Sequence, residues 1–296
     1  MKNPFHPRSP ALLKTPMTTQ MPPPYIGRVA LAVADIERSI RFYSEVIGLA
    51  LLSRDGDAAQ MGAGDTPLLL LHDQPGLTPV RRATGLYHFA LLLPSRADLG
   101  DALQHYVAVN APISGFADHA VSEAIYLTDP DGHGIEVYRD RPREEWAYTN
   151  GALRMTTEPI DFDGVLRSRS GAWRGLPPGT MMGHIHLQVA QIEATERFYI
   201  DLIGQDLVLR YGPSATFLSA NGYHHHIGGN TWAGVGLPPA PADAARLLWY
   251  EIRQPDAAAI DAIAARLATA GYGHERDTTG LRVVDPSGIQ LLLTAH

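Results

Sequence analysis

Three ionisable side chains of metal-binding types stand far apart in the sequence, at His88, Glu136 and His184. Two imidazoles and one carboxylate form the facial triad that holds non-haem Fe(II) and leaves neighbouring coordination positions open. The same ligands suit Mn(II) and Zn(II), so ligand type alone does not select the metal. The alternative is that the histidines are hydrogen-bonded core residues and the glutamate is a carboxylate at a strand edge. To act together, the three residues must be brought to one point by the fold.

A second candidate is the stretch YHHHIGGN at 223–230, which places three consecutive histidines among apolar residues and glycines. Alternate side chains of a β-strand face opposite sides, so a strand here would put His224 and His226 on one face and His225 on the other. The three imidazoles therefore cannot all serve one site. A set of histidines that only packs in the core is the alternative.

An internal repeat indicates which elements carry these residues. Residues 25–54 align without a gap on 181–210, with identical residues at thirteen positions of the first copy: Gly27, Leu31, Val33, Ala34, Ile36, Glu37, Arg41, Phe42, Tyr43, Ile47, Gly48, Leu51 and Arg54. Such self-similarity indicates a duplicated architecture. Each copy predicts a strand, a short helix that ends at Gly48 or Gly204 in the left-handed cap position, and three strands. The last strand of the second copy would contain the three histidines.

A related unit follows each copy, at 84–140 and at 245–295. Each predicts a first strand, a helix and a final strand pair joined through DPDG or DPSG, because proline and glycine favour a tight turn. The sequence therefore predicts an α+β protein of four βαβββ modules. We expect a disordered tail at 1–24, one two-module domain at 25–140, a linker at 141–180 rich in charge, glycine and proline, and a second two-module domain at 181–296.

The triad stands out where the modules differ. In the first strand of the third module, His184 takes the position that Arg28 has in the first module. His88 in the second module corresponds to Trp249 in the fourth, and Glu136 corresponds to Leu292. Metal-binding residue types thus occupy equivalent positions in modules two and three only. The set favours one retained site whose pseudo-symmetric counterpart has been lost.

Composition excludes several classes of function. The formal net charge of −7 gives no basic surface for a phosphate backbone, so a nucleic acid partner is not expected. The absence of cysteine excludes disulfides, thiolate ligands and a cysteine nucleophile. No apolar run is long enough to span a membrane, and the first 24 residues lack the apolar core of a signal peptide. We expect a cytoplasmic protein that acts on small molecules.

The segments GHIHLQV, GLYHFALLLP, DPDGHGIEVY and GYHHHIGGNTWAG together resemble the two-domain catechol 2,3-dioxygenases of the vicinal oxygen chelate superfamily, over nearly the whole chain after residue 24. The RFY and IG pattern alone is shared with glyoxalase I and antibiotic-resistance proteins. The resemblance implies an Fe(II)-dependent extradiol dioxygenase that inserts O₂ into a catechol to give a ring-opened semialdehyde. It also implies a homo-oligomer, and it assigns the iron to His88, Glu136 and His184.

The resemblance further implies roles around the metal. His225 matches a histidine that acts as acid and base, Tyr126 matches a tyrosine that hydrogen-bonds a substrate hydroxyl, and His119 is a further catalytic candidate. Asn230, Trp232 and His226 are expected to contact the substrate. His186 lies on the same strand face as His184 and competes with it as a ligand, but the family pattern places the ligand directly after Gly183.

One departure from the family pattern concerns the halves of the chain, because His184 lies in the second half whereas His88 and Glu136 lie in the first. Modules two and three must therefore face each other, within the chain or across a dimer. Two alternatives stay open. A glyoxalase-type lyase or isomerase would use Zn(II) or Ni(II) and typically two carboxylates, and a metal-free drug-binding resistance protein would need no triad.

Overall fold

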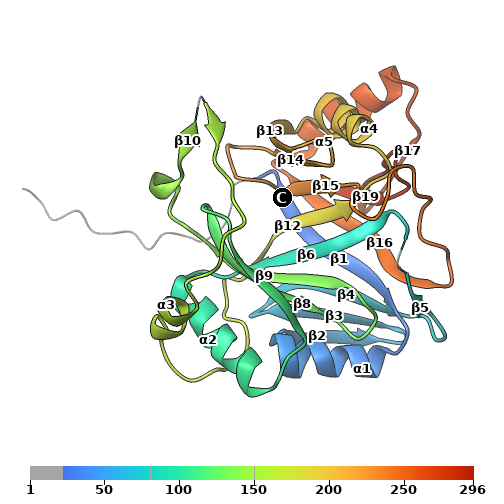
Figure 1. Cartoon of the computed structure of the whole chain (residues 1–296). Coiled ribbons are helices and arrows are strands. Elements are labelled where there is room, and N and C mark those ends of the chain that lie inside the picture. Colours follow the sequence, from blue (N-terminus) through green and yellow to red (C-terminus); the bar gives the residue numbers. More distant parts are fainter. Residues whose placement is uncertain (1–22, 81, 150) are drawn as a thin grey trace, which may run out of the picture.

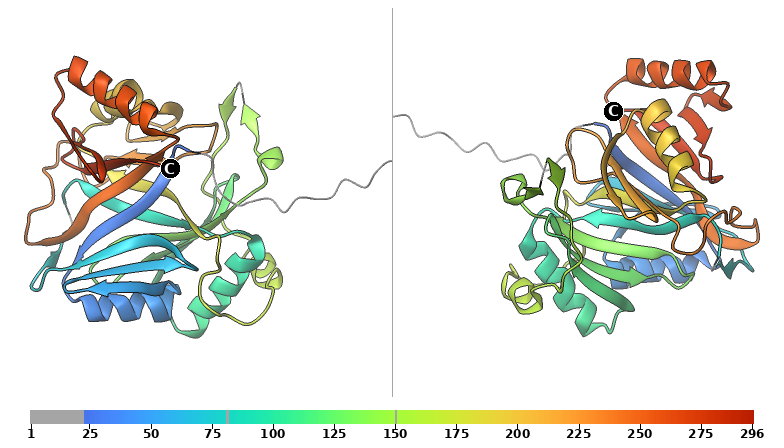
Figure 2. Two further views of the ribbon diagram at one scale, coloured as in Figure 1. Left: turned by 180° about the vertical axis from the view of Figure 1, so that it is seen from behind. Right: turned by 45° about the horizontal axis from the view of Figure 1, so that its top comes forward.

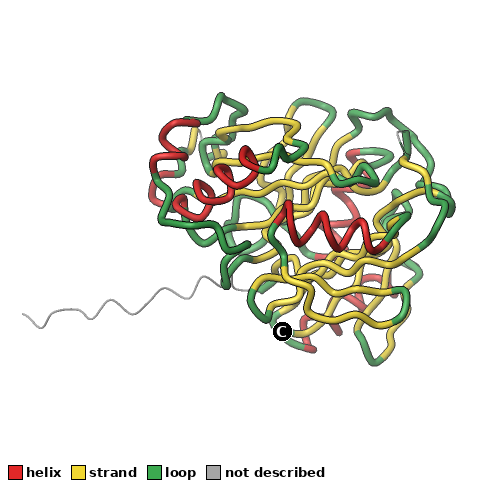
Figure 3. The backbone as a smooth tube through the Cα atoms, turned by 90° about the horizontal axis from the view of Figure 1, so that it is seen from below, coloured by secondary structure: helices red, strands yellow, loops and turns green. Residues whose placement is uncertain are grey.

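The computed structural model describes residues 23–80, 82–149 and 151–296, so nearly all of the predicted tail at 1–24 lies outside the described residues. The strands form two large curved sheets, and the helices lie at opposite ends of the molecule (Figure 1). Helices α4 and α5 lie at one end and α1 and α2 at the other, as the view from behind also shows (Figure 2). Seen from below, one helix crosses in front of the strands and further helices lie beside them (Figure 3).

Each of the four predicted modules has one strand, one helix and three further strands. The elements of modules one and two are β1 (Tyr25–Val33), α1 (Ile36–Arg41), η1 (Phe42–Ile47), β2 (Ala50–Asp55), β3 (Ala58–Ala63), β4 (Thr66–Asp73), β6 (Gly85–Leu92), α2 (Arg96–Ala108), β7 (Ile113–Asp118), β8 (Ser122–Thr128) and β9 (Gly134–Asp140). Those of modules three and four are β12 (Met181–Gln188), α4 (Ile192–Arg197), η3 (Phe198–Ile203), β13 (Asp206–Tyr211), β14 (Ala215–Ser219), β15 (Ile227–Asn230), β16 (Ala244–Gln254), α5 (Ala257–Thr269), β17 (His274–Asp277), β18 (Gly280–Val284) and β19 (Gln290–Ala295). The predicted α+β class is therefore confirmed.

Short elements lie between the modules. The two-residue strand β5 (Thr78–Pro79) pairs with β16, and the segment 141–180 contains η2 (Arg143–Glu145), the strand pair β10 (Tyr148–Thr149) and β11 (Ala152–Leu153), and α3 (Phe162–Arg167). The predicted linker thus contains structure of its own, and α3 approaches α2 so closely that a Cβ at Gly100 would lie 2.4 Å from the Val165 carbonyl oxygen.

The helix that follows the first strand of modules one and three ends as the sequence predicts. In module one the Asp35 side chain accepts a hydrogen bond from the Arg38 amide at the helix start. The α-helix then widens into a π-helical turn and ends at Gly48, whose φ of 94° is a left-handed cap conformation that suits glycine. Gly204 takes the same place in module three, with a φ of 92°.

The sheets combine modules from opposite halves of the chain. The first sheet has the order β17-β18-β19-β16-β1-β4-β3-β2, so modules one and four share it. The second sheet has the order β13-β14-β15-β12-β6-β9-β8-β7 and joins modules two and three. The central pairs, β1 with β16 and β12 with β6, are antiparallel. Modules two and three therefore face each other within one chain, whereas the limits 25–140 and 181–296 stay a prediction about domain organisation.

Strand alternation gives the second sheet two different faces. Along β6, Phe89 and Leu91 belong to the main apolar core, whereas His88 and Ala90 point to the opposite face. Strands β8, β9 and β12 alternate in the same way, because successive side chains of a strand point to opposite sides. The curvature of the sheet makes the second face a concave surface, on which the polar residues gather.

Candidate metal centre and its cavity

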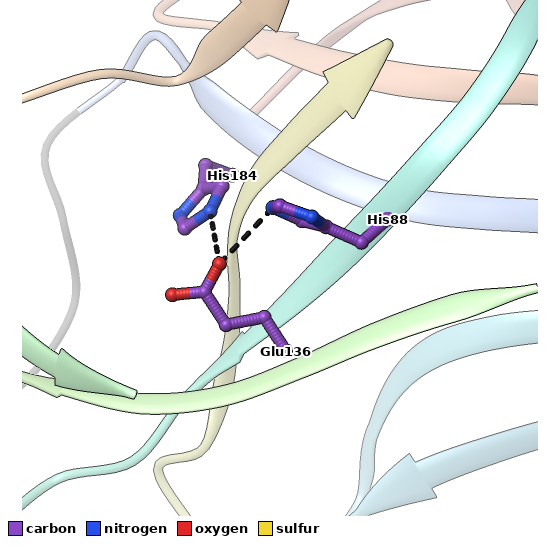
Figure 4. Close-up of side chains that lie close together, drawn as sticks. All are labelled: His88, Glu136 and His184. Carbon is purple, nitrogen blue, oxygen red and sulfur yellow. Dashed lines mark hydrogen bonds and ion pairs between the residues drawn. The ribbon is translucent and has the colours of Figure 1, made fainter. Parts of the chain in front are cut away.

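The three residues of the predicted triad lie on three adjacent strands of the second sheet, with His184 on β12, His88 on β6 and Glu136 on β9. The register explains how they meet. Ala90 of β6 pairs with His184 on one side and with Glu136 on the other. Its small side chain leaves space for the two longer side chains to converge over it, together with His88 from the same face of β6 (Figure 4).

The donor atoms of this triad converge on one point. Nε2 of His88 and Nε2 of His184 each lie 3.0 Å from Oε2 of Glu136, and the donor atoms all lie within 4.8 Å of one another. The buried Nε2 of His88 nevertheless has no hydrogen-bond partner. Ligands at right angles, each about 2.1 Å from one ion, are separated by about 3 Å. The arrangement therefore fits a divalent metal ion, and the triad is a candidate metal site.

Protonation states support this fit. Burial alone would raise the pKa of the Glu136 carboxyl, but the imidazoles of His184 and His88 outweigh burial and hold this pKa well below its usual range. Burial lowers the pKa of His184 to about 4. At neutral pH the carboxylate is thus charged and the His184 imidazole is neutral, which are the forms that bind metals. His186, the competing histidine, lines the same cavity, but within the described ranges the donor group consists of the predicted three residues only.

The three consecutive histidines do not lie in a strand, which corrects the sequence-based expectation. Asn221 and Gly222 have φ angles of 58° and 65° and turn the chain, and β15 begins only at Ile227. Residues 224–226 form an irregular segment between the turn and the strand, so strand alternation does not apply to them. His225 lines the cavity, and its ring centroid lies 4.1 Å from that of His184.

The other two histidines point elsewhere. Nδ1 of His226 lies 3.0 Å from the Ser219 hydroxyl, and the cavity lining does not include His226. His224 is completely buried, with Nε2 at 2.8 Å from Asp140 Oδ1. The expected substrate contact of His226 therefore lacks support from the structure.

Asn230, also predicted to contact the substrate, is buried outside the cavity lining. Its side-chain oxygen accepts a hydrogen bond from the Trp232 amide at 3.0 Å, so the asparagine shapes the turn after β15. Trp232 itself lines the cavity and is 50% exposed. Sequence alone could not separate these two neighbours, because the end of a short strand decides which side chain turns inward.

Tyr126 and His119 form a connected pair beside the triad, and both line the cavity. Tyr126 pairs directly with Glu136 across β8 and β9. Nδ1 of His119 lies 2.6 Å from the Thr156 carbonyl oxygen, which can only accept, so Nδ1 carries the proton. Nε2 of His119 therefore accepts the hydrogen bond from the Tyr126 hydroxyl, 2.7 Å away. Burial raises the pKa of Tyr126 well above its usual range, so the phenol stays protonated and its oxygen can accept a further hydrogen bond.

The triad lies in a cavity of about 1160 Å³, which also touches strands of the other sheet. Tyr87 and Trp232 are in edge-to-face contact with ring centroids 5.3 Å apart, and each also contacts His186. Tyr87 was missed by the sequence-based argument, as was Asp140, which holds His224. Asp140 shares the strand parity of Glu136 in β9, and that period of two was the signal that could have identified it.

The equivalent region of the first sheet contains an ion pair. Arg28, at the position of His184, contacts the Glu251 carboxylate with Nε 2.8 Å from Oε2. The Thr294 hydroxyl donates a hydrogen bond to the same carboxylate at 2.8 Å, and the Arg28 guanidinium lies 5.7 Å from the Trp249 ring centroid. The divergence between modules that identified the triad therefore separates a candidate metal site from a salt bridge.

Comparisons with known proteins agree with this architecture. The model of the Glyoxalase/Bleomycin resistance protein/Dioxygenase superfamily matches residues 25–137. The catechol-2,3-dioxygenase of Bacillus subtilis (strain 168) is 44% identical over 268 residues, which cover 88% of this chain and 94% of the relative.

Solved structures show the same fold at low sequence identity. A putative dioxygenase from Bacillus subtilis matches with a TM-score of 0.64 and 16% identity over 92% of this chain and 84% of its own. Glyoxalase I from Zea mays matches with a TM-score of 0.56 and 14% identity over 92% of each chain. In the part of the chain that the structure covers, no helix is both long and apolar enough to cross a membrane. By its sequence and its fold, the chain belongs to the Glyoxalase/Bleomycin resistance protein/Dioxygenase superfamily, in the family of the Bacillus subtilis catechol-2,3-dioxygenase.

Proposed function

We propose that this protein is an extradiol dioxygenase that uses O₂ to open the ring of a catechol beside its two hydroxyl groups, giving a semialdehyde. The observation that carries the proposal is the convergence of His88, Glu136 and His184 on one point within the cavity. The relationship to a catechol-2,3-dioxygenase at 44% identity supports the same reaction.

The metal of this proposal is Fe(II), held by the two Nε2 atoms and the carboxylate of the triad. When bound, a divalent ion there supplies Lewis acidity, which lowers the pKa of a hydroxyl ligand, and open positions for two further ligands. The protein contributes a buried carboxylate that balances part of the metal charge, since Glu136 is 2% exposed and ionised. Mn(II) and Zn(II) satisfy the same donor atoms, so metal content is the measurement that selects among them.

His225 is the proposed acid and base. The His225 imidazole lies against His184 at the cavity wall, where it can accept a proton from a phenolic hydroxyl and return it later in the reaction. Tyr126 is the proposed partner of the second oxygen of the substrate. Because its proton is directed to His119, its oxygen is left to accept a hydrogen bond from a substrate hydroxyl.

Aromatic side chains would hold the ring of the substrate and limit access of water. Phe217 lies 5.0 Å from His225 between ring centroids, and Tyr87 and Trp232 contact each other at the cavity wall. Edge-to-face and stacked contacts with a catechol ring are each worth about 1 kcal/mol beyond their burial.

The test is anaerobic purification with Fe(II), followed by metal analysis and detection of the yellow ring-opened product with a panel of plain, alkyl, halogenated and aryl diols. We expect one iron per chain, activity that a chelator abolishes, and recovery with Fe(II). His184→Gln should lose both metal and activity. His186→Gln, a matched control on the same strand face, should retain one metal per chain. Zinc or nickel without ring cleavage would support a lyase or isomerase instead, and a protein that binds no metal would support drug binding.

Two further expectations accompany this proposal. Assembly into a homo-oligomer and a cytoplasmic location stay predictions. Light scattering coupled to size-exclusion chromatography measures the first, and fractionation of the source cells measures the second.

A further inference from the structure

A chain of hydrogen bonds connects the edge of the second sheet to the cavity. Asp140, the last residue of β9, has Oδ1 2.8 Å from Nε2 of His224. Nδ1 of His224 lies 2.8 Å from Nδ1 of His225, whose ring lines the cavity. In the described part of the chain, Nε2 of His225 makes no hydrogen bond. The free nitrogen of His225 is thus the one that can act in the cavity.

Hydrogen-bond chemistry fixes the direction of this chain. A carboxylate can only accept, so Nε2 of His224 carries a proton and donates it to Asp140. The neutral imidazole of His224 then has a lone pair at Nδ1, which must accept from Nδ1–H of His225. Nε2 of His225 is left with its lone pair. The reverse order would point two lone pairs at each other across the 2.8 Å between His224 and Asp140.

We propose that Asp140 is a positioning residue that acts through His224 to fix the tautomer of His225, so that Nε2 of His225 presents a lone pair to the substrate. This inference rests on the proposed function, in which His225 is the base. Asp140 itself does not touch the substrate. It determines which nitrogen of His225 is ready to accept a proton.

The surroundings hold this chain of hydrogen bonds from Asp140 through His224 to His225, called the relay below, in place. His224 is 0% exposed, and its ring centroid lies 4.1 Å from that of Tyr223 and 5.5 Å from that of Trp146. The Asp140 side chain is 23% exposed, so the anionic end of the relay is in contact with solvent while the histidines are not. A buried imidazole that cannot rotate keeps the hydrogen-bond pattern that its neighbours impose.

The first sheet lacks this relay. The strand register aligns Ile227 of β15 with Leu69 of β4, because each pairs with the equivalent residue of β12 or β1. Counted back three and two residues along the chain from these partners, module three has His224 and His225, whereas module one has Thr66 and Pro67. The relay therefore accompanies the triad in the second sheet and is absent where the ion pair has replaced the triad.

The decisive variant is Asp140→Asn, because an amide can turn its NH₂ group toward His224 and reverse the whole chain. His225 would then carry its proton at Nε2. Asp140→Glu keeps a carboxylate acceptor and is the conservative variant. Glu145→Gln is the matched control, since it also changes an acid into an amide nearby, and its contact is with Arg141 at 3.8 Å instead of the histidines.

Two readouts are combined. The first is ¹⁵N NMR of histidine-labelled, metal-free protein, with the His225 signals assigned by comparison with His225→Asn. It reports directly which ring nitrogen carries the proton. The second is steady-state kinetics of the Fe(II)-loaded enzyme, with iron content measured on the same samples.

We expect the wild-type protein and Glu145→Gln to show the proton at Nδ1 of His225. Asp140→Asn should move it to Nε2 and lower kcat by about 100-fold, with KM and iron content little changed, because a positioned general base contributes about that factor. Asp140→Glu should restore most of kcat. If Asp140→Asn does not fold, His224→Phe tests the same link and should lose the fixed tautomer and kcat together.

An unchanged His225 tautomer and kcat in both Asp140→Asn and His224→Phe would overturn the proposal, because an amide can still accept from His224 through Oδ1 whereas phenylalanine makes no hydrogen bond. If the wild-type enzyme cleaves no diol, the proposed function fails. The NMR comparison then still decides whether Asp140 sets the tautomer of His225.

Discussion

Removing one carboxylate from each sheet separates metal binding from folding. Glu136→Gln changes the candidate metal site, and Glu251→Gln changes a buried carboxylate of the first sheet that pairs with Arg28. The two glutamates are similarly buried, with exposures of 2% and 1%. Each substitution keeps the size of the side chain and removes one negative charge. The pair therefore forms an internal control for the loss of a buried carboxylate.

The two substitutions should have opposite consequences. In metal-free Glu136→Gln the amide can still hydrogen-bond the neutral His184 imidazole, so stability should change by less than about 1 kcal/mol. Glu251→Gln leaves a guanidinium whose side chain is 27% exposed without its partner, which should cost about 2 kcal/mol. A metal present at 1,000 times its dissociation constant stabilises the wild-type protein by about 4 kcal/mol. We expect Glu136→Gln to lose that stabilisation and Glu251→Gln to keep it.

Differential scanning calorimetry with and without Mn(II), an air-stable probe for imidazole and carboxylate ligands, measures both effects. The Tm of the wild-type protein and of Glu251→Gln should rise by roughly 8 °C or more with the metal, and the Tm of metal-free Glu251→Gln should start roughly 5 °C lower. A full Mn(II) shift in Glu136→Gln would refute the assignment of this carboxylate as a metal ligand. Loss of the shift in Glu251→Gln would show that the salt bridge supports the site.

Three further predictions concern Asp285, Gly183 and Tyr126. Burial raises the pKa of Asp285 to about 6, above the value of 3.8 expected in the unfolded chain. The carboxyl therefore stabilises the fold most below pH 3.8, and this contribution is lost as the pH rises through 6. Urea unfolding measures the free energy of unfolding of the wild type and of Asp285→Asn from pH 4 to pH 7. The difference between the two free energies should shift in favour of the variant by up to about 3 kcal/mol as the pH rises. A difference that does not depend on pH contradicts this. A Cβ at Gly183 would lie 1.8 Å from the Tyr138 hydroxyl oxygen, so Gly183→Ala should lose about 2 kcal/mol in the same assay, and wild-type stability would contradict the close approach. Tyr126→Phe should lower kcat/KM for catechol about tenfold at unchanged iron content, whereas loss of iron would indicate a structural role instead.

The sequence by itself determined the modules and the identity of the triad. A period of two marks the strands, and glycine marks the helix ends at Gly48 and Gly204, because both signals depend on neighbouring residues only. The constant offset between the copies made His184 comparable with Arg28, and this contrast separated the candidate metal ligands from ordinary buried histidines.

Only the tertiary structure decided which modules share a sheet and how the histidines at 224–226 point. Pairing of β6 with β12 joins residues about 100 positions apart, and no local pattern specifies such a partner. The turn at Asn221 and Gly222 removes the histidines from the strand, and the relay from Asp140 to His225 exists because strand β9 ends beside that turn. Local chemistry thus determined the residues of the site, whereas contacts between distant strands determined their geometry.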